Sequence, residues 1–158
     1  MIRRRVAGVL LIIMGFLFIS PQVFAQEIVE YKPISVELLR VVLADVKGWM
    51  TETIAFRENA KNLTLEELVQ QASAIRKKFD PVMVLMATTE PPDDYKVAAT
   101  LLLMGTKGLE LSLWHYILAG VTSTQVSIDH GDTLLQPAVD QIGYAERLFD
   151  NDPDTSSP

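Results

Sequence analysis

The stretch that decides the fold is residues 93–120, DDYKVAATLLLMGTKGLELSLWHYILAG. Its few polar side chains are typical of a helix that neighbouring elements cover on most sides. Small residues recur in it every seven positions, at Ala98, Gly105, Ser112 and Ala119. A row of this kind lets another backbone come close. We therefore expect a central helix that is packed tightly against its neighbours.

Helical periodicity continues on both sides of this stretch. Apolar residues repeat every three or four positions over 35–63, 65–88 and 128–149. Ser35 is a suitable N-cap for the first of these helices, and Thr64-Leu65-Glu66-Glu67 has the form of a capping box that opens the second. No segment shows a strand pattern. The sequence predicts an all-α fold, an antiparallel up-down-up-down four-helix bundle over residues 35–149.

Two prolines interrupt these helical patterns. Pro81 removes a backbone donor and restricts Asp80, so we expect a kink there, or a helix that restarts with Asp80 as its cap. Pro137 likewise predicts a kink or a helix start near that position.

The N-terminus has the pattern of an export signal. Arg3, Arg4 and Arg5 precede an apolar run over residues 6–19, and Val23 and Ala25 then fit the −3 and −1 positions of a signal-peptidase site. We predict a signal peptide at 1–25, a linker at 26–34 and a disordered acidic tail at 150–158. The alternative is an uncleaved membrane anchor, although the run is shorter than the ~20 residues of a spanning helix. The sequence thus predicts an exported protein, periplasmic or extracellular.

Charge and cysteine content narrow the function classes. The 158-residue chain has a net charge of −6 and no cysteine. Removal of 1–25 would take three of its 14 basic and none of its 20 acidic residues, which deepens the charge to −9. An acidic chain is a poor binder of nucleic acid, and the absence of cysteine excludes disulfides, thiolate metal sites and a cysteine nucleophile.

His115 is the first candidate for binding chemistry. A histidine in a bundle core can be an axial ligand of haem or a metal, with a methionine such as Met50, Met83, Met86 or Met104 as the second ligand. The alternative is a partly buried histidine with a structural role. Glu110 lies five residues earlier, which places it on another face of the helix.

A second candidate is the segment that holds the other histidine. Asp129, His130 and Asp132 offer carboxylate and imidazole ligands to a divalent metal. The alternative is a capping turn, in which Gly131 supplies a permissive backbone and Asp132 or Thr133 caps the last helix.

No nucleophile or metalloprotease motif is present in the sequence, and we expect no cofactor and no enzymatic activity. The sequence favours a partner-binding or structural accessory of the cell envelope, which binds another protein or self-associates. The alternative is a small-ligand, haem or metal-binding bundle that uses His115 and core methionines.

Overall fold

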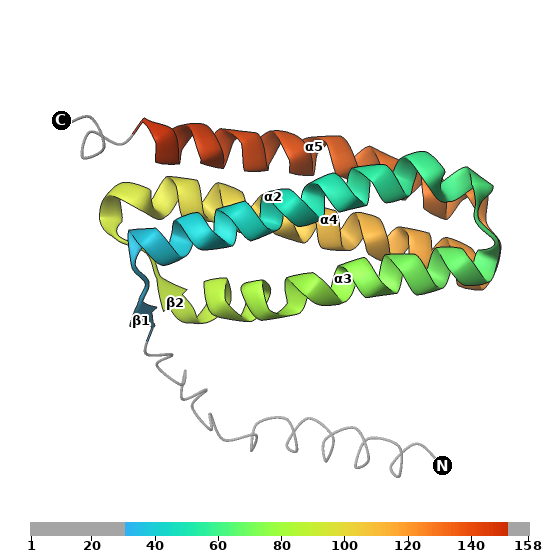
Figure 1. The fold of residues 1–158 in the computed structure, drawn as a ribbon, viewed down its shortest axis with the longest axis horizontal. Helices are drawn as coiled ribbons and strands as arrows, with labels where there is room; N and C mark the ends of the chain where they lie inside the picture. Colours follow the sequence, from blue (N-terminus) through green and yellow to red (C-terminus); the bar gives the residue numbers. More distant parts are fainter. Residues whose placement is uncertain (1–30, 152–158) are drawn as a thin grey trace, which may run out of the picture. The chain divides into compact units, whose positions relative to one another are not determined.

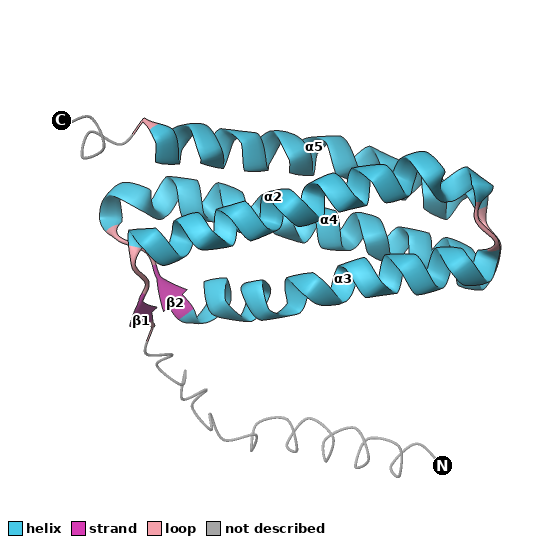
Figure 2. Ribbon diagram, viewed as in Figure 1, coloured by secondary structure: helices cyan, strands magenta, loops and turns pink. Residues whose placement is uncertain are grey.

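The computed structural model describes residues 31–151, and within them the fold is all-α, as predicted (Figures 1 and 2). Four long helices lie side by side, and short connections join consecutive helices at alternating ends. The expected signal peptide at 1–25 lies outside the described residues, as does most of the expected tail. The elements in chain order are β1 (Lys32–Pro33), α2 (Val36–Asn59), η1 (Ala60–Asn62), α3 (Leu65–Thr88), β2 (Thr89–Glu90), η2 (Asp93–Tyr95), α4 (Lys96–Thr122) and α5 (Gln125–Asp150).

The predicted helix starts are confirmed at α2 and α3. The Ser35 side chain accepts a hydrogen bond from the backbone N–H of Leu38 at 3.2 Å. At α3, Thr64 accepts from the Glu67 N–H at 3.3 Å, and the Glu67 carboxylate accepts from the Thr64 N–H at 2.9 Å. These side chains satisfy donors that the first turn of a helix leaves without partners.

Neither proline begins a new helix. α3 runs through Pro81 to Thr88, so Asp80 is an interior residue rather than a cap. α5 likewise begins at Gln125 and runs through Pro137. In both helices the surrounding apolar residues are buried against neighbours, and this packing outweighs the one backbone hydrogen bond that each proline removes.

The expectation of no strand is wrong in one place. Lys32–Pro33 pairs in parallel with Thr89–Glu90, and the Ile34 N–H donates to the Glu90 carbonyl at 3.1 Å. The Ile34 side chain is buried in the core. Strands of two residues are too short to show an alternating pattern in the sequence.

Small residues bring α4 close to its neighbours. All four members of the row Ala98, Gly105, Ser112 and Ala119 are buried, as the sequence predicts. A Cβ built on Gly105 would lie 2.6 Å from Ile142 Cγ1 and 2.9 Å from the carbonyl oxygen of Ala138 in α5. The absence of a side chain at Gly105 is therefore a condition of the α4–α5 contact.

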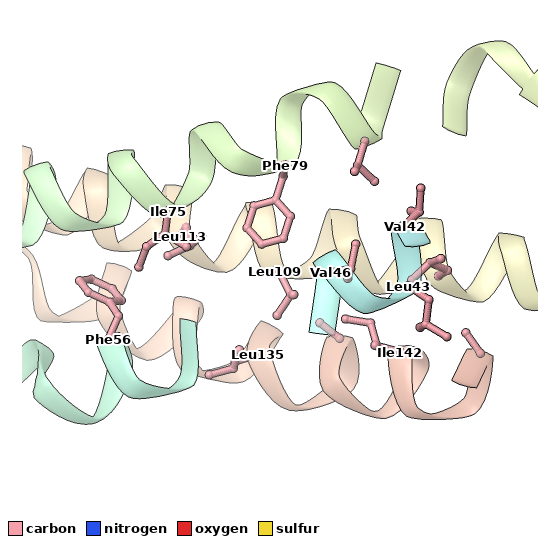
Figure 3. Close-up of a cluster of buried hydrophobic side chains, with 14 of the residues drawn as sticks. Val42, Leu43, Val46, Phe56, Ile75, Phe79, Leu109, Leu113, Leu135 and Ile142 are labelled. Carbon is pink, nitrogen blue, oxygen red and sulfur yellow. The ribbon is translucent and has the colours of Figure 1, made fainter. Parts of the chain in front are cut away.

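The core lies between the four helices. Figure 3 shows side chains from each of them in one cluster, including Phe56 of α2, Phe79 of α3, Leu109 of α4 and Ile142 of α5. The Phe79 ring meets Trp49 edge to face, with 5.3 Å between ring centroids. Among residues 31–151, no helix is both long and apolar enough to cross a membrane.

Candidate functional site

The structure brings the two histidines of the chain together. His115 of α4 and His130 of α5 meet edge to face, with 5.5 Å between ring centroids and 82° between ring planes. From the sequence alone, each histidine belongs to a different candidate site. Their contact follows from the antiparallel approach of α4 and α5, whose connection at 123–124 is short.

The His115 ring has one unsatisfied polar atom. Its Nδ1 is buried and has no hydrogen-bond partner, whereas the His130 side chain is exposed. Glu110 does not supply the missing bond, and its carboxylate instead accepts from Arg76 Nη1 of α3 at 2.8 Å. The paired rings are therefore a place where a ligand could satisfy a polar group that the protein leaves open.

Two of the methionines suggested as second ligands, Met50 and Met104, lie away from this pair. Met104 is half exposed, and it precedes His115 by eleven residues, about 16 Å along the same helix. Met50 packs against the core at a position six residues, about 9 Å, before Phe56. Phe56 is the α2 residue whose ring meets Tyr116, next to His115. A His115–Met104 pair cannot bind one ion.

The second candidate set does not converge either. Within residues 31–151, no three histidine, aspartate or glutamate side chains are grouped so that they could hold a metal. Asp129 accepts from the Gln125 side chain at 3.1 Å, and Asp132 accepts from Arg57 Nε at 3.0 Å. The alternative of a capping turn is also wrong, because α5 begins earlier, after Thr124.

Gly131 has a packing role in place of the predicted turn. Ser112 Oγ donates to the Gly131 carbonyl at 2.8 Å, and a Cβ on Gly131 would lie 3.0 Å from Tyr116 Cε2. The Tyr116 hydroxyl donates to Asp132. Burial, followed by this hydrogen bond, raises the pKa of Tyr116 above its ordinary value, and the same carboxylate raises the pKa of Arg57. Asp132 thus joins α2, α4 and α5 instead of offering a free ligand.

The face of α4 that the other helices leave uncovered has a pattern of its own. From Val97 to Val121, the exposed residues of α4 are spaced alternately three and four positions apart, which is the a/d spacing of a coiled-coil seam. Six of the eight are apolar, with 45% to 70% of their surface exposed. We call this set the outer seam: Val97, Thr100, Met104, Lys107, Leu111, Trp114, Leu118 and Val121.

An apolar hollow of about 210 Å³ lies on the outer seam, next to the histidine pair. Leu111, Trp114, His115 and Leu118 line it. These residues occupy positions i, i+3, i+4 and i+7 of α4, which is the arrangement of four side chains that forms the hole for a knob from a facing helix. The Arg76 guanidinium of α3 lies over the Trp114 ring at the edge of this hollow, 5.7 Å from the ring centroid.

Sequence reasoning missed the outer seam, although a signal was present. Val97, Met104, Leu111 and Leu118 repeat every seven residues, each one position before a member of the small-residue row. Because residues 93–120 are apolar on nearly every side, the sequence alone does not show which row faces the core.

No family model, curated protein or solved structure matches the chain.

Proposed function

We propose that the chain is an exported, non-enzymatic, antiparallel four-helix bundle of the cell envelope that binds another α-helix through the outer seam. The observation that carries the proposal is the eight-residue a/d pattern exposed along α4. Large apolar patches on soluble proteins mark interaction sites, and an a/d pattern specifies a helical partner.

The charge of the outer seam supports a protein partner. The chain as a whole has 20 acidic residues, yet the seam contains none, and its one charged member is Lys107. Interface centres are depleted of charge and enriched in aromatic residues and methionine, as the seam is at Trp114 and Met104. The expected partner helix presents an apolar seam, with an acidic residue beside it near the level of Lys107.

Export rests on the pattern of residues 1–25. N-terminal sequencing of the protein expressed from the full chain gives the test, and a mature chain that begins at Gln26 is expected. If the purified protein still begins at Met1, the signal segment is not cleaved, and the protein would instead be anchored by it.

The seam is tested by placing a photo-crosslinking amino acid at single positions of the full-length protein in cells. At Leu111 we expect an adduct whose attachment point maps by mass spectrometry to an amphipathic helix. The matched control is Val84 of α3, which is 63% exposed but lies outside the seam. Adducts of equal yield at both positions, or none at Leu111, would refute the proposed binding face.

A second candidate function is transition-metal binding by the histidine pair. Two imidazoles on one tetrahedral zinc ion place their ring centroids about 5 Å apart, given Zn–N bonds of about 2 Å. The observed separation is 5.5 Å, and His115 Nδ1 has no other partner. With two protein ligands, water would complete the coordination of a bound Zn²⁺ or Ni²⁺.

Calorimetric titration with Zn²⁺ and Ni²⁺ tests this second function. The wild type is expected to bind, His115→Ala and His130→Ala to lose binding, and Asp129→Asn to retain it. Since the chain has only these two histidines, binding that survives both alanine substitutions would assign the metal to another site.

A further inference from the structure

We propose that the helix bound by the outer seam is α4 of a second copy of this chain, packed antiparallel about a two-fold axis level with Leu109. This inference rests on the proposed function and names its partner. Two-fold interfaces are the commonest in homo-oligomers, and they require a surface that is complementary to itself. The outer seam meets this requirement in its register, its shape, its charge and its area.

The register of the seam is self-complementary. In an antiparallel pair centred on Leu109, each a position lies level with a d position of the other helix. Val97 then faces Val121 of the second copy, and Met104 faces Trp114 of the second copy. Thr100 faces Leu118, and Lys107 faces Leu111, in the same way. Every layer of the seam contains at least one apolar side chain.

The shape of the seam fits the same register. The hollow between Leu111 and Leu118 is centred midway between Trp114 and His115, which is the level that Met104 of the second copy reaches. Methionine is flexible enough to fill an irregular hollow, and its sulfur packs favourably against an aromatic ring such as that of Trp114. Because the dimer is two-fold symmetric, the Met104–Trp114 contact forms twice.

The charges near the axis agree with antiparallel pairing. Lys107 of one copy lies within one residue of the level of Glu110 of the other. Glu110 is held in place by Arg76, and a quarter of its side chain stays exposed. Opposite charges thus flank the axis on both sides, whereas a parallel pair would place Lys107 beside Lys107.

The seam also offers the area that a stable dimer needs. Six of its side chains are 45% to 70% exposed, which leaves roughly 100 Å² on each, and α4 is long enough to pair over its whole length. With Thr100 and Lys107 included, each copy contributes on the order of 800 Å², the share of one partner in a standard-size interface.

Light scattering over a dilution series of the protein expressed from the full chain measures the association. We expect a dimer whose dissociation constant rises about 100-fold or more in Leu111→Lys, because pairing would bury the new charge opposite Lys107 of the second copy. Val84→Lys, an equally charged change at an exposed position of α3, leaves the constant unchanged. A wild type that stays monomeric at every concentration overturns the proposal, as does equal weakening by both substitutions.

Spin labels determine the register, and the absence of cysteine allows single labelled positions. Labels at Val97→Cys are expected about 36 Å apart across an antiparallel dimer, and labels at Lys107→Cys are expected close together. Short distances at both positions would mean parallel pairing and would overturn the register.

The two proposals can fail separately. If the protein is monomeric but Leu111 crosslinks to a helix of another protein, the second copy is refuted and the binding face stands. If the protein forms a dimer that Leu111→Lys does not weaken and Leu111 gives no specific crosslink, both are refuted.

Discussion

The two faces of α4 repeat every seven residues, but they present opposite kinds of side chain. The inner row of Ala98, Gly105, Ser112 and Ala119 is small and buried. The row that precedes it by one residue, Val97, Met104, Leu111 and Leu118, is large, apolar and 45% to 65% exposed. On this helix, the more hydrophobic of the two rows faces outward.

The difference shows that side-chain size, as well as hydrophobicity, decides which face of α4 enters the bundle. Gly105 and Gly108 meet α5 at distances that allow no Cβ, and Gly120 meets Val69 of α3 in the same way. A helix turned to bury the outer row could not approach α5 or α3 so closely. Close packing thus leaves the large apolar row outside, where another helix can use it.

The largest expected effect separates two leucines that lie two residues apart on α4. Leu109 is fully buried, whereas Leu111 is 47% exposed. Leu109→Ala is expected to lower the free energy of unfolding by about 3 kcal/mol, because it removes buried methyl groups and leaves a cavity. Leu111→Ala should change it by less than about 1 kcal/mol. Urea unfolding of dilute protein measures both, and similar losses would mean that the outer row also belongs to the monomer core.

A second contrast concerns two glycines in helices. Gly105→Ala is expected to cost about 2 kcal/mol, because its Cβ would press on Ile142 and on the backbone of Ala138. Gly48→Ala in α2 has nothing within 4 Å of the new Cβ, so alanine should stabilise that helix by up to about 1 kcal/mol. Thermal unfolding followed by circular dichroism measures whether each substitution raises or lowers the melting temperature. Stabilisation by both substitutions would contradict the close α4–α5 contact.

The hydroxyl of Tyr116 gives a third, pH-dependent contrast. Burial raises its pKa in the folded protein above the ordinary 10.0, so the folded state retains a proton that the unfolded state releases. The stability due to this group is complete below about pH 10 and declines as the pH rises further, by about 1 kcal/mol over one unit.

Tyr116→Phe isolates this contribution. The variant lacks the hydrogen bond to Asp132, so it should be about 1 kcal/mol less stable than the wild type near pH 8. Between pH 10 and pH 11 this difference should narrow, as urea unfolding at a series of pH values will show. If the difference in unfolding free energy between the two proteins does not change with pH, the pKa of Tyr116 is the same in the folded and unfolded states.

The sequence predicted those parts of the fold that local chemistry controls. The Thr64–Glu67 capping box and the buried row of α4 follow from residue type and spacing, and both are confirmed. The helix starts considered at Pro81 and Pro137 do not occur, and the short strands were not predicted, because packing between distant segments decides both features. A proline pattern shows the cost of a continuous helix but does not show the contacts that offset it.

The candidate site was less predictable for the same reason. The sequence singled out His115 and His130, yet their contact depends on how α4 and α5 align. It offered Met104 as a core ligand, and the structure places that side chain on the outer seam. One helix that is apolar on nearly every side has several possible inner faces, and only its neighbours select among them.

The smallest expected effect compares two ion pairs that hold α3 to its neighbours. Arg76 pairs with Glu110 beside the outer seam, where a quarter of each side chain is exposed, and Lys78 pairs with Glu52 where 42% of each is exposed. Glu110→Gln should cost about 1 kcal/mol and Glu52→Gln about half of that, because water screens the more exposed pair. Urea unfolding at low and high salt measures both, and high salt should weaken the Lys78–Glu52 pair more. If Glu110→Gln costs no stability but weakens the association of the two copies, Glu110 acts on Lys107 of the second copy without stabilising the monomer.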